Sequence, residues 1–362
     1  MRAGLLVAGI GLMALLATGC SSARYYTQAV QGHCQIVFRA RPIERVLADS
    51  NTPPALGHKL QLILELRRFA ESELRLPANR HYLRYADLSR EYVVWNVEAA
   101  PEFSLQPKHW WYPVVGRLTY RGYFDEQMAR DEAARLAAHG YDTHVGGIEA
   151  YSTLGWFRDP VLNTFIQRDG PALADLIFHE LAHQRVFAKG DTDFNEAFAV
   201  AVARAGVRQW LQARGDAAAL AKWEAAERCR EQFVQIVQGT RRELAQLYAA
   251  TNTPPALQRE RKAAVLARFQ RLVREWKQES GCEGEYSAWL DQPVNNARLN
   301  TVATYYDLVP AFERLLAECV GDWERFFTRV EKIAKLPKPA RRQALSPPAP
   351  TTGRADSGPS SP

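Results

Sequence analysis

Hydrophobic residues recur at helical spacing through most of the second half of the chain. Between residues 171 and 335 the apolar positions fall three or four residues apart, with charged residues between them. This pattern predicts amphipathic helices, each of which buries one face. We expect helices at about 171–187, 194–214, 216–250, 255–279 and 309–335.

The period changes between residues 92 and 149, where β-branched and aromatic residues form short runs separated by turn residues. The runs "EYVVWNVEA", "YPVVGRLTYRGYF" and "YDTHVGGIEAYS" predict strands. A helix lies between the second and third runs, with Asp125 as its cap and Gly140 as its stop. The predicted fold class is therefore α+β, with a small mixed β-sheet at about 90–155 followed by a predominantly α-helical half at about 171–335.

The stretch "NTPPALGHKLQLILELRRFAESEL" predicts one more helix, with Thr52 as cap and Pro53 in the first turn. "NTPPAL" recurs at 252–257, again before a helical pattern, and no further similarity surrounds the two copies. Shared capping chemistry therefore explains this repeat better than a duplicated domain does. Residues 25–40 show no strong period, so no element is predicted there.

The chain opens with the pattern of a secretory signal. One positive charge precedes an apolar run from Leu5 to Ala17, which is too short to span a membrane. The sequence "ATGC" resembles a bacterial lipobox, which implies that residues 1–19 are removed and that Cys20 is lipidated. Ser21 follows the cysteine, and the same resemblance then implies the periplasmic face of the outer membrane. The expected membrane contact is this N-terminal lipid anchor.

The far end of the chain differs from the rest in composition. Residues 336–362 are rich in Pro and Ser, carry several basic residues and lack apolar periodicity, so we expect a disordered tail. A single domain is then expected at 20–335. The net charge of +6 belongs partly to this tail. No basic stripe with interleaved aromatic residues is present in the sequence, so a nucleic-acid partner is not expected.

Four cysteines remain after the signal, at Cys34, Cys229, Cys282 and Cys319. They lack the short paired spacing of a zinc ribbon, so we do not expect them to bind metal. An oxidising periplasm permits disulfides, and four cysteines allow three pairings that the sequence cannot rank.

The most informative chemistry lies in "HELAHQ", where His179 and His183 are four residues apart and Glu180 follows the first. In a helix the two imidazoles lie on one face, where they can bind one zinc ion, while Glu180 can act on a water molecule. The flanking residues are uncharged, which favours a buried stripe over a solvent-facing helix with accidental histidines.

Catalytic zinc needs a third protein ligand, and Glu196 in "FNEAFA" is the leading candidate. Gly190 supplies a turn and Asp193 can cap a second helix, so a short antiparallel hairpin returns Glu196 to His183. The same spacing also fits a capping-box role for Glu196. Weaker alternatives for the third ligand are Glu149, Asp175 and Asp191.

The combination "HELAHQ…FNEAFA" resembles the gluzincin aminopeptidases. The resemblance implies a zincin-like catalytic half, with His179, His183 and Glu196 as zinc ligands and Glu180 as general base. The chain departs from this family in two ways. The gap before Glu196 is shorter, and Val200 stands where some members have an acid, which leaves the residues that support the ligands unassigned.

A narrower resemblance covers most of the chain. The blocks "YRGYF", "AYSTLGWFRDP", "HELAHQ", "GDTDFNEAFA" and "NNARL…YY" occur in the same order as in a bacterial family of predicted lipid-anchored zinc aminopeptidases, and the lipobox fits as well. This resemblance implies peptide substrates and a tether to the membrane.

Two further roles have candidates. Glu149 in "GGIEAYS" lies in a stretch that resembles the strand with which large aminopeptidases bind the substrate amine, so it is a candidate amine anchor. An oxyanion donor is expected among the tyrosines, with Tyr305 ahead of Tyr306 and Tyr151. For His144 and for the tryptophans we expect surface and core roles.

The sequence thus predicts a zinc aminopeptidase that acts on peptides, with Glu180 as the general base. Two alternatives stay open. One is an endopeptidase with the same zinc core and an open cleft, and the other is a non-catalytic envelope lipoprotein that serves as a binding or assembly factor.

Overall fold

A computed structural model describes residues 23–112, 116–150, 158–250, 252–282 and 287–346. Its strands are β1 (Arg41–Pro42), β2 (Arg84–Ala86), β3 (Val94–Pro101), β4 (Trp110–Tyr112), β5 (Gly116–Leu118), β6 (Tyr120–Tyr123), β7 (Tyr141–Ile148) and β8 (Val161–Leu162). The α+β class is confirmed, but these strands form three small sheets rather than one.

The sheet that contains the two longest strands, β3 and β7, has the order β6-β3-β7 and is antiparallel throughout. In the smaller sheet β1-β2-β8, β2 pairs antiparallel with β1 and parallel with β8. The predicted strand at 112–124 is divided, because β4 pairs with β5 while β6 joins β3. Gly116, the first residue of β5, has φ +85°, a left-handed conformation that favours glycine.

Helices make up the rest of the fold. They are α2 (Ile43–Leu47), α3 (Pro54–Ser72), α4 (Glu126–Ala137), α5 (Asn163–Ile166), α6 (Gly170–Arg185), α7 (Thr192–Ala213), α8 (Ala217–Ala249), α9 (Pro255–Ser280), α10 (Ser287–Leu290), α11 (Asn296–Tyr306), α12 (Val309–Glu318), α13 (Trp323–Ala334) and α14 (Lys338–Leu345). Residues 23–39 are helical as well.

Several of these helices correct the sequence prediction. The single helix expected at 309–335 is two helices, because Val320 and Gly321 have positive φ and turn the chain between them. The segment 23–39 was missed because its apolar residues lie on both the buried and the exposed side, which blurs the period. Part of the expected disordered tail is helix α14, while residues 347–362 lie outside the described structure.

The two "NTPPAL" copies adopt the same local structure. In each the helix begins at the second proline, and the first proline occupies the N-cap position with φ −55°. Thr52 is therefore not the helix cap; its hydroxyl donates instead to the carbonyl of Val46 at 2.6 Å. Proline favours the first helical turn because its missing N–H would have no partner there.

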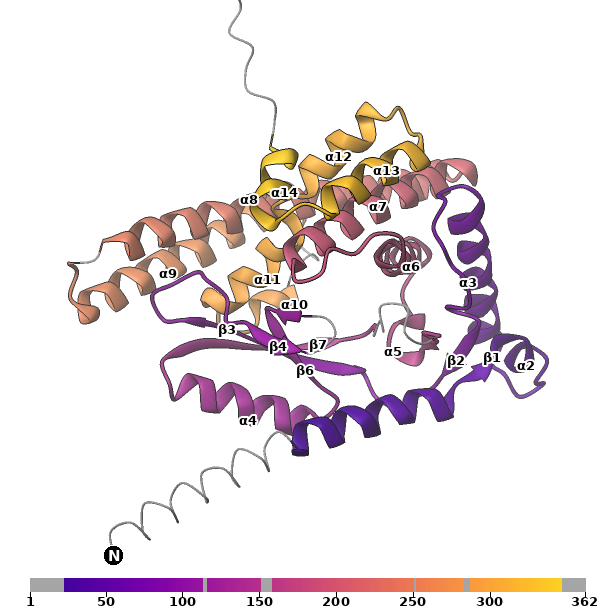
Figure 1. The fold of residues 1–362 in the computed structure, drawn as a ribbon, viewed down its shortest axis with the longest axis horizontal. Coiled ribbons are helices and arrows are strands. Elements are labelled where there is room, and N and C mark those ends of the chain that lie inside the picture. The colour runs from indigo at the N-terminus through magenta and orange to yellow at the C-terminus, as the bar shows by residue number, and fades with distance from the viewer. Residues whose placement is uncertain (1–22, 113–115, 151–157, 251, 283–286, 347–362) are drawn as a thin grey trace, which may run out of the picture.

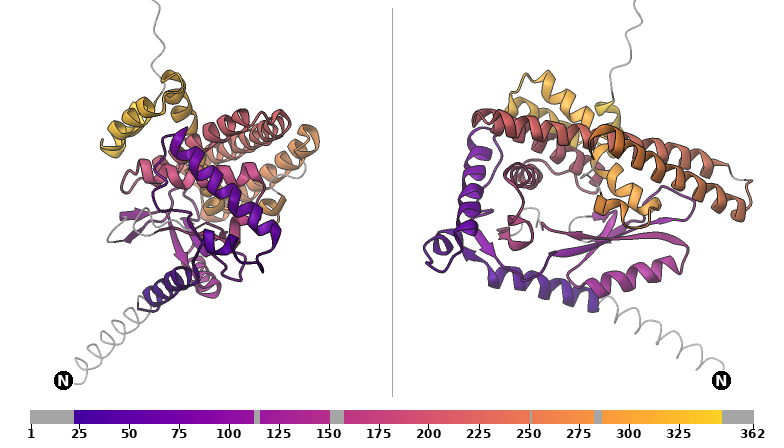
Figure 2. Two further views of the ribbon diagram at one scale, coloured as in Figure 1. Left: turned by 90° about the vertical axis from the view of Figure 1, so that its right-hand side faces the viewer. Right: turned by 180° about the vertical axis from the view of Figure 1, so that it is seen from behind.

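The sheet β6-β3-β7 has helices on both faces. Figure 1 shows α4 below the sheet and α11 above it, and Figure 2 shows the same order from behind. Val97 and Ala99 of β3 pack against Ala129 and Ala133 of α4. The other face, which carries Asn96 and Glu98, is turned toward α11 and the helical half, because successive strand residues point to opposite sides.

The main hydrophobic core surrounds α7. Its Phe194 and Phe198 are fully buried and pack against Phe312, Phe326 and Phe327 of α12 and α13. A separate core joins α8, α9 and α11. Because these apolar residues of α7 are buried, the helix has a fixed orientation, and with it Glu196.

One disulfide joins Cys229 of α8 to Cys282, just after α9, with 5.9 Å between the Cα atoms. This is one of the pairings that the sequence left open. Cys34 and Cys319 are free thiols in the structure. Within the described residues, none of the helices has the length and apolar character that crossing a membrane requires.

Candidate metal centre

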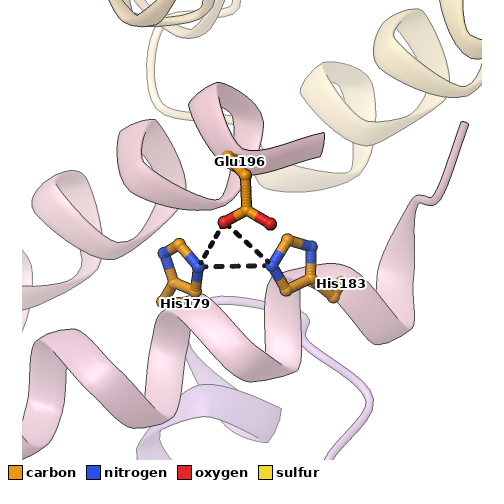
Figure 3. A group of neighbouring side chains, drawn as sticks. All are labelled: His179, His183 and Glu196. Carbon is orange, nitrogen blue, oxygen red and sulfur yellow. Dashed lines mark hydrogen bonds and ion pairs between the residues drawn. The ribbon is translucent and has the colours of Figure 1, made fainter. Parts of the chain in front are cut away.

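The two histidines lie on α6, whose start and end are well defined. The side chain of Asp169 caps the helix by accepting from the amide of Ala172 at 2.9 Å, and Pro171 occupies its first turn. Leu173, Ile177 and their apolar neighbours bury one side of the helix completely. His179 and His183, one turn apart, face the neighbouring helix α7 instead (Figure 3).

A short connection then leads from α6 to α7 and returns the chain to the side of α6 that carries the two histidines. The side chain of Asn195 bridges the turn, since its Oδ1 accepts from the Ala188 amide at 2.7 Å and its Nδ2 donates to the Ala188 carbonyl at 3.0 Å. This pair of hydrogen bonds holds the start of α7 against the end of α6. Glu196 is the next residue, and it is thereby placed opposite both histidines.

Asp193 was expected to cap this helix, but α7 begins one residue before it, with Asp191 at the N-cap position and no side-chain capping bond. Asp191 and Asp193 instead pair with the basic residues of α14. Arg341 contacts Asp191 at 2.8 Å, and Arg342 contacts Asp193 at 2.8 Å. The C-terminal helix that the sequence did not predict therefore braces the turn beside the site.

Three ligand-type atoms converge between the two helices (Figure 3). The Nε2 atoms of His179 and His183 are 3.2 Å apart, and Oε2 of Glu196 lies 3.3 Å from the first and 3.7 Å from the second. In the described residues these three side chains form the cluster that could hold a metal ion. Glu149, Asp175 and Asp191, the weaker alternatives, are not part of it.

The pKa values of His179 and Glu196 in this cluster are shifted strongly in opposite directions. Burial lowers the pKa of His179, but its hydrogen bond with Glu196 and nearby carboxylates outweigh this effect and raise the pKa to about 9. Burial raises the pKa of Glu196, yet the charges of both histidines and their hydrogen bonds bring it below its usual range. A carboxylate and imidazoles held this closely attract a cation or share a proton.

Glu180 and the cluster line one cleft of about 340 Å³, whose opposite wall is formed by Val94, Asn96 and other residues of the sheet β6-β3-β7. Burial is the main cause that raises the pKa of Glu180, and the two histidines oppose it. The structure thus places the predicted base in the same cleft as the predicted ligands.

Glu149 is not brought into this cleft. Its neighbours Ile148 and Ala150 line the cleft, while the Glu149 carboxylate accepts from Nε of Arg168 at 2.7 Å. Alternation along the extended chain explains the difference. In this structure Arg168 supplies the positive partner of Glu149, and the amine-anchor role of Glu149 stays a prediction.

Of the three predicted oxyanion donors, the structure describes the side chain of Tyr306 alone. Tyr151 and the side chain of Tyr305 lie outside the described residues. Tyr306 is partly buried, its ring centre lies 5.6 Å from the guanidinium carbon of Arg204, and it does not line the cleft. Tyr120 lines the cleft and was missed, as was the bridging role of Asn195, although "FNE" already placed that asparagine beside Glu196.

The fold and this centre define an α+β protein in which a helical hairpin holds two histidines and a glutamate beside a further glutamate in a cleft. Residues 24–345 match the family described as "Putative aminopeptidase", and the chain belongs to this family. The comparison with curated proteins and the comparison with solved structures each gave no match.

Proposed function

We propose that this protein is a zinc-dependent aminopeptidase that removes N-terminal residues from peptides. The observation that carries the proposal is the convergence of His179, His183 and Glu196 beside Glu180 in one cleft, in a chain of an aminopeptidase family. Two imidazoles and one carboxylate are a donor set of catalytic zinc sites, which keep a fourth position for water or substrate.

The spacing of the three donor atoms fits zinc. Bonds of about 2.0–2.2 Å in tetrahedral geometry put neighbouring ligand atoms roughly 3.3–3.6 Å apart. The observed separations of 3.2, 3.3 and 3.7 Å lie close to this range. Within the described residues, Nδ1 of His183 is buried without a hydrogen-bond partner, while its Nε2 faces the other two donor atoms.

Zinc held there would polarise the scissile carbonyl and make a water molecule more acidic. Glu180 then accepts the proton of the attacking water and passes it to the leaving amine, as a general base that becomes a general acid. The cleft wall from the sheet orients the peptide, and β7, an edge strand of its sheet among the described residues, can pair with an extended backbone.

A panel of peptides tests this function. The zinc-loaded protein should cleave peptides with a free N-terminus at least about tenfold more efficiently than their N-acetylated forms, because an aminopeptidase recognises the charged terminus. The measurement is kcat/KM for amino-acid amides, intact peptides and N-acetylated peptides. Equal cleavage of free and acetylated peptides would mean an endopeptidase. No cleavage by fully metallated protein would favour a binding or assembly factor.

The proposal includes a lipid-anchored location in the cell envelope, on the periplasmic face of the outer membrane. Cys20 lies outside the described residues, so its support is the lipobox resemblance. Cys20→Ser should prevent lipidation and move the protein from the membrane pellet to the soluble fraction, because the lipid is the proposed anchor. Fractionation with antibody detection measures this. A variant that stays in the pellet would point to a second means of membrane attachment.

A further inference from the structure

A second cavity adjoins the cleft that contains His179, His183 and Glu196, which we call the metal cleft. This side cavity has a volume of about 210 Å³ and shares Asn96, Tyr120, Ile148 and Thr192 with the cleft as common lining residues. From this junction it continues along β3 and β7 toward α11. A substrate bound at the metal centre can therefore extend a group into it.

The side cavity contains a carboxyl group that the proposed chemistry does not use. Glu98 lies two residues beyond Asn96 on the same face of β3. Its Oε2 atom is buried and has no hydrogen-bond partner among the described residues, and the structure gives Glu98 no ion pair there. A buried acceptor left without a donor costs free energy, so its presence calls for a ligand that supplies one.

A second acceptor reaches the cavity from the "NNARL" block. Asn296 donates to three carbonyl oxygens in the segment 101–104 and so ties α11 to the end of β3. One turn later, Nδ2 of Asn300 donates to the carbonyl of Leu105 at 3.0 Å. This bond directs the amide so that its Oδ1 is left as an acceptor, which is buried and without a partner within the described residues.

The histidine of this wall, His144, does not act as a cation that would pair with the two acceptors. His144 lies directly opposite Glu98 in the β3–β7 register. Burial, together with the charge of Arg298, lowers the pKa of His144 to about 4, so the ring is neutral at pH 7. Arg298 does not line the cavity; its guanidinium stacks on Trp289, 4.5 Å from the ring centre. Among the described residues that line it, the cavity therefore offers two acceptors without a partner and holds no cation.

We infer that the side cavity is a specificity subsite for the ammonium group of a basic N-terminal side chain, held by Glu98 and Asn300. This inference rests on the proposed peptidase function. An ammonium group carries three donors and can satisfy two acceptors that line the same cavity. The α-ammonium is two bonds from the scissile carbonyl and stays in the metal cleft. A lysine stem carries its ammonium about 6 Å farther, into the side cavity.

The test compares N-terminal lysine with norleucine, which has the same chain length without the charge. The native enzyme should show a kcat/KM at least about tenfold higher for lysine peptides. Glu98→Gln should bring this ratio to within about threefold of unity and leave the norleucine value nearly unchanged, because the amide removes only the charge. Burial raises the pKa of Glu98 to about 8, so the pocket tolerates a neutral group and the variant should fold. A bound ammonium group favours the ionised carboxylate and lowers this pKa, so the charge that distinguishes glutamate from glutamine is present when lysine binds.

A matched control and a second measurement separate the possible failures. Glu126→Gln, an exposed carboxylate on α4 away from the cavity, should keep the native ratio. Calorimetry with lysinamide and norleucinamide on the Glu180→Gln protein tests the subsite without turnover of these amides, and adding Glu98→Gln to it should abolish the preference for lysinamide. Glu98-dependent lysinamide binding without any peptide cleavage would support the subsite while it defeats the peptidase proposal.

Three results would overturn the inference. The native enzyme could prefer norleucine or show no preference, as expected of a cavity that holds only water. The lysine preference could survive Glu98→Gln with the fold intact by circular dichroism. Finally, Glu98→Gln could erase the preference for free over acetylated termini while the lysine ratio is unchanged, which would assign Glu98 to the α-ammonium instead.

Discussion

Glu180→Gln is expected to lose peptidase activity by about 100- to 10,000-fold while the protein keeps its fold and its zinc. Glu180 lies in the metal cleft beside His179 but is not part of the three-residue cluster. Glutamine has nearly the same shape and cannot accept a proton at neutral pH. The variant therefore removes the proposed proton acceptor and leaves the three proposed metal ligands in place.

The readouts are kcat/KM on a free peptide and zinc content by mass spectrometry, on the same preparation. Most of the loss should appear in kcat, because proton transfer belongs to the transition state more than to substrate binding. Glu126→Gln, at an exposed position on α4, serves as the control for the substitution itself. A fully active Glu180→Gln enzyme would require another base, and loss of zinc in this variant would make Glu180 a ligand.

The helical half could be predicted well because its signals are local. Apolar spacing together with caps such as Asp169 and Asp216 sets where helices start, and the structure has α6, α7, α8 and α9 within a few residues of the predicted ranges. The convergence of His179, His183 and Glu196 could also be predicted from the sequence, because a helical turn and a short helical hairpin are enough to place all three.

The positions of side chains in the β-rich half could not be predicted from the sequence. A carboxylate on a strand points to one of two faces, and a shift of one residue reverses it. This is why the sequence did not indicate that the Glu149 carboxylate pairs with Arg168. Glu98 and Asn300 line the same cavity although about two hundred residues separate them in the sequence, and no local pattern predicts such a meeting.

The second prediction with a large expected effect concerns the affinity of the protein for zinc. The native protein should carry about one zinc ion per chain, and Glu196→Ala should lower zinc affinity by more than 100-fold. Loss of a residue that only supports a ligand costs about 10- to 100-fold, and removal of one of three ligands should exceed that. His183→Ala should behave in the same way, since its Nε2 lies 3.2 Å from that of His179 and 3.7 Å from Glu196.

A competition titration with a chelator of known affinity measures this loss directly, without any dependence on substrate. Asp193→Asn is the matched control, because Asp193 lies three residues before Glu196 on α7 but pairs outward with Arg342. If helix disruption rather than ligation caused the effect, the control would lose zinc too. Native zinc affinity in Glu196→Ala, with the fold intact, would show that the third ligand lies elsewhere and that Glu196 only positions the two histidines.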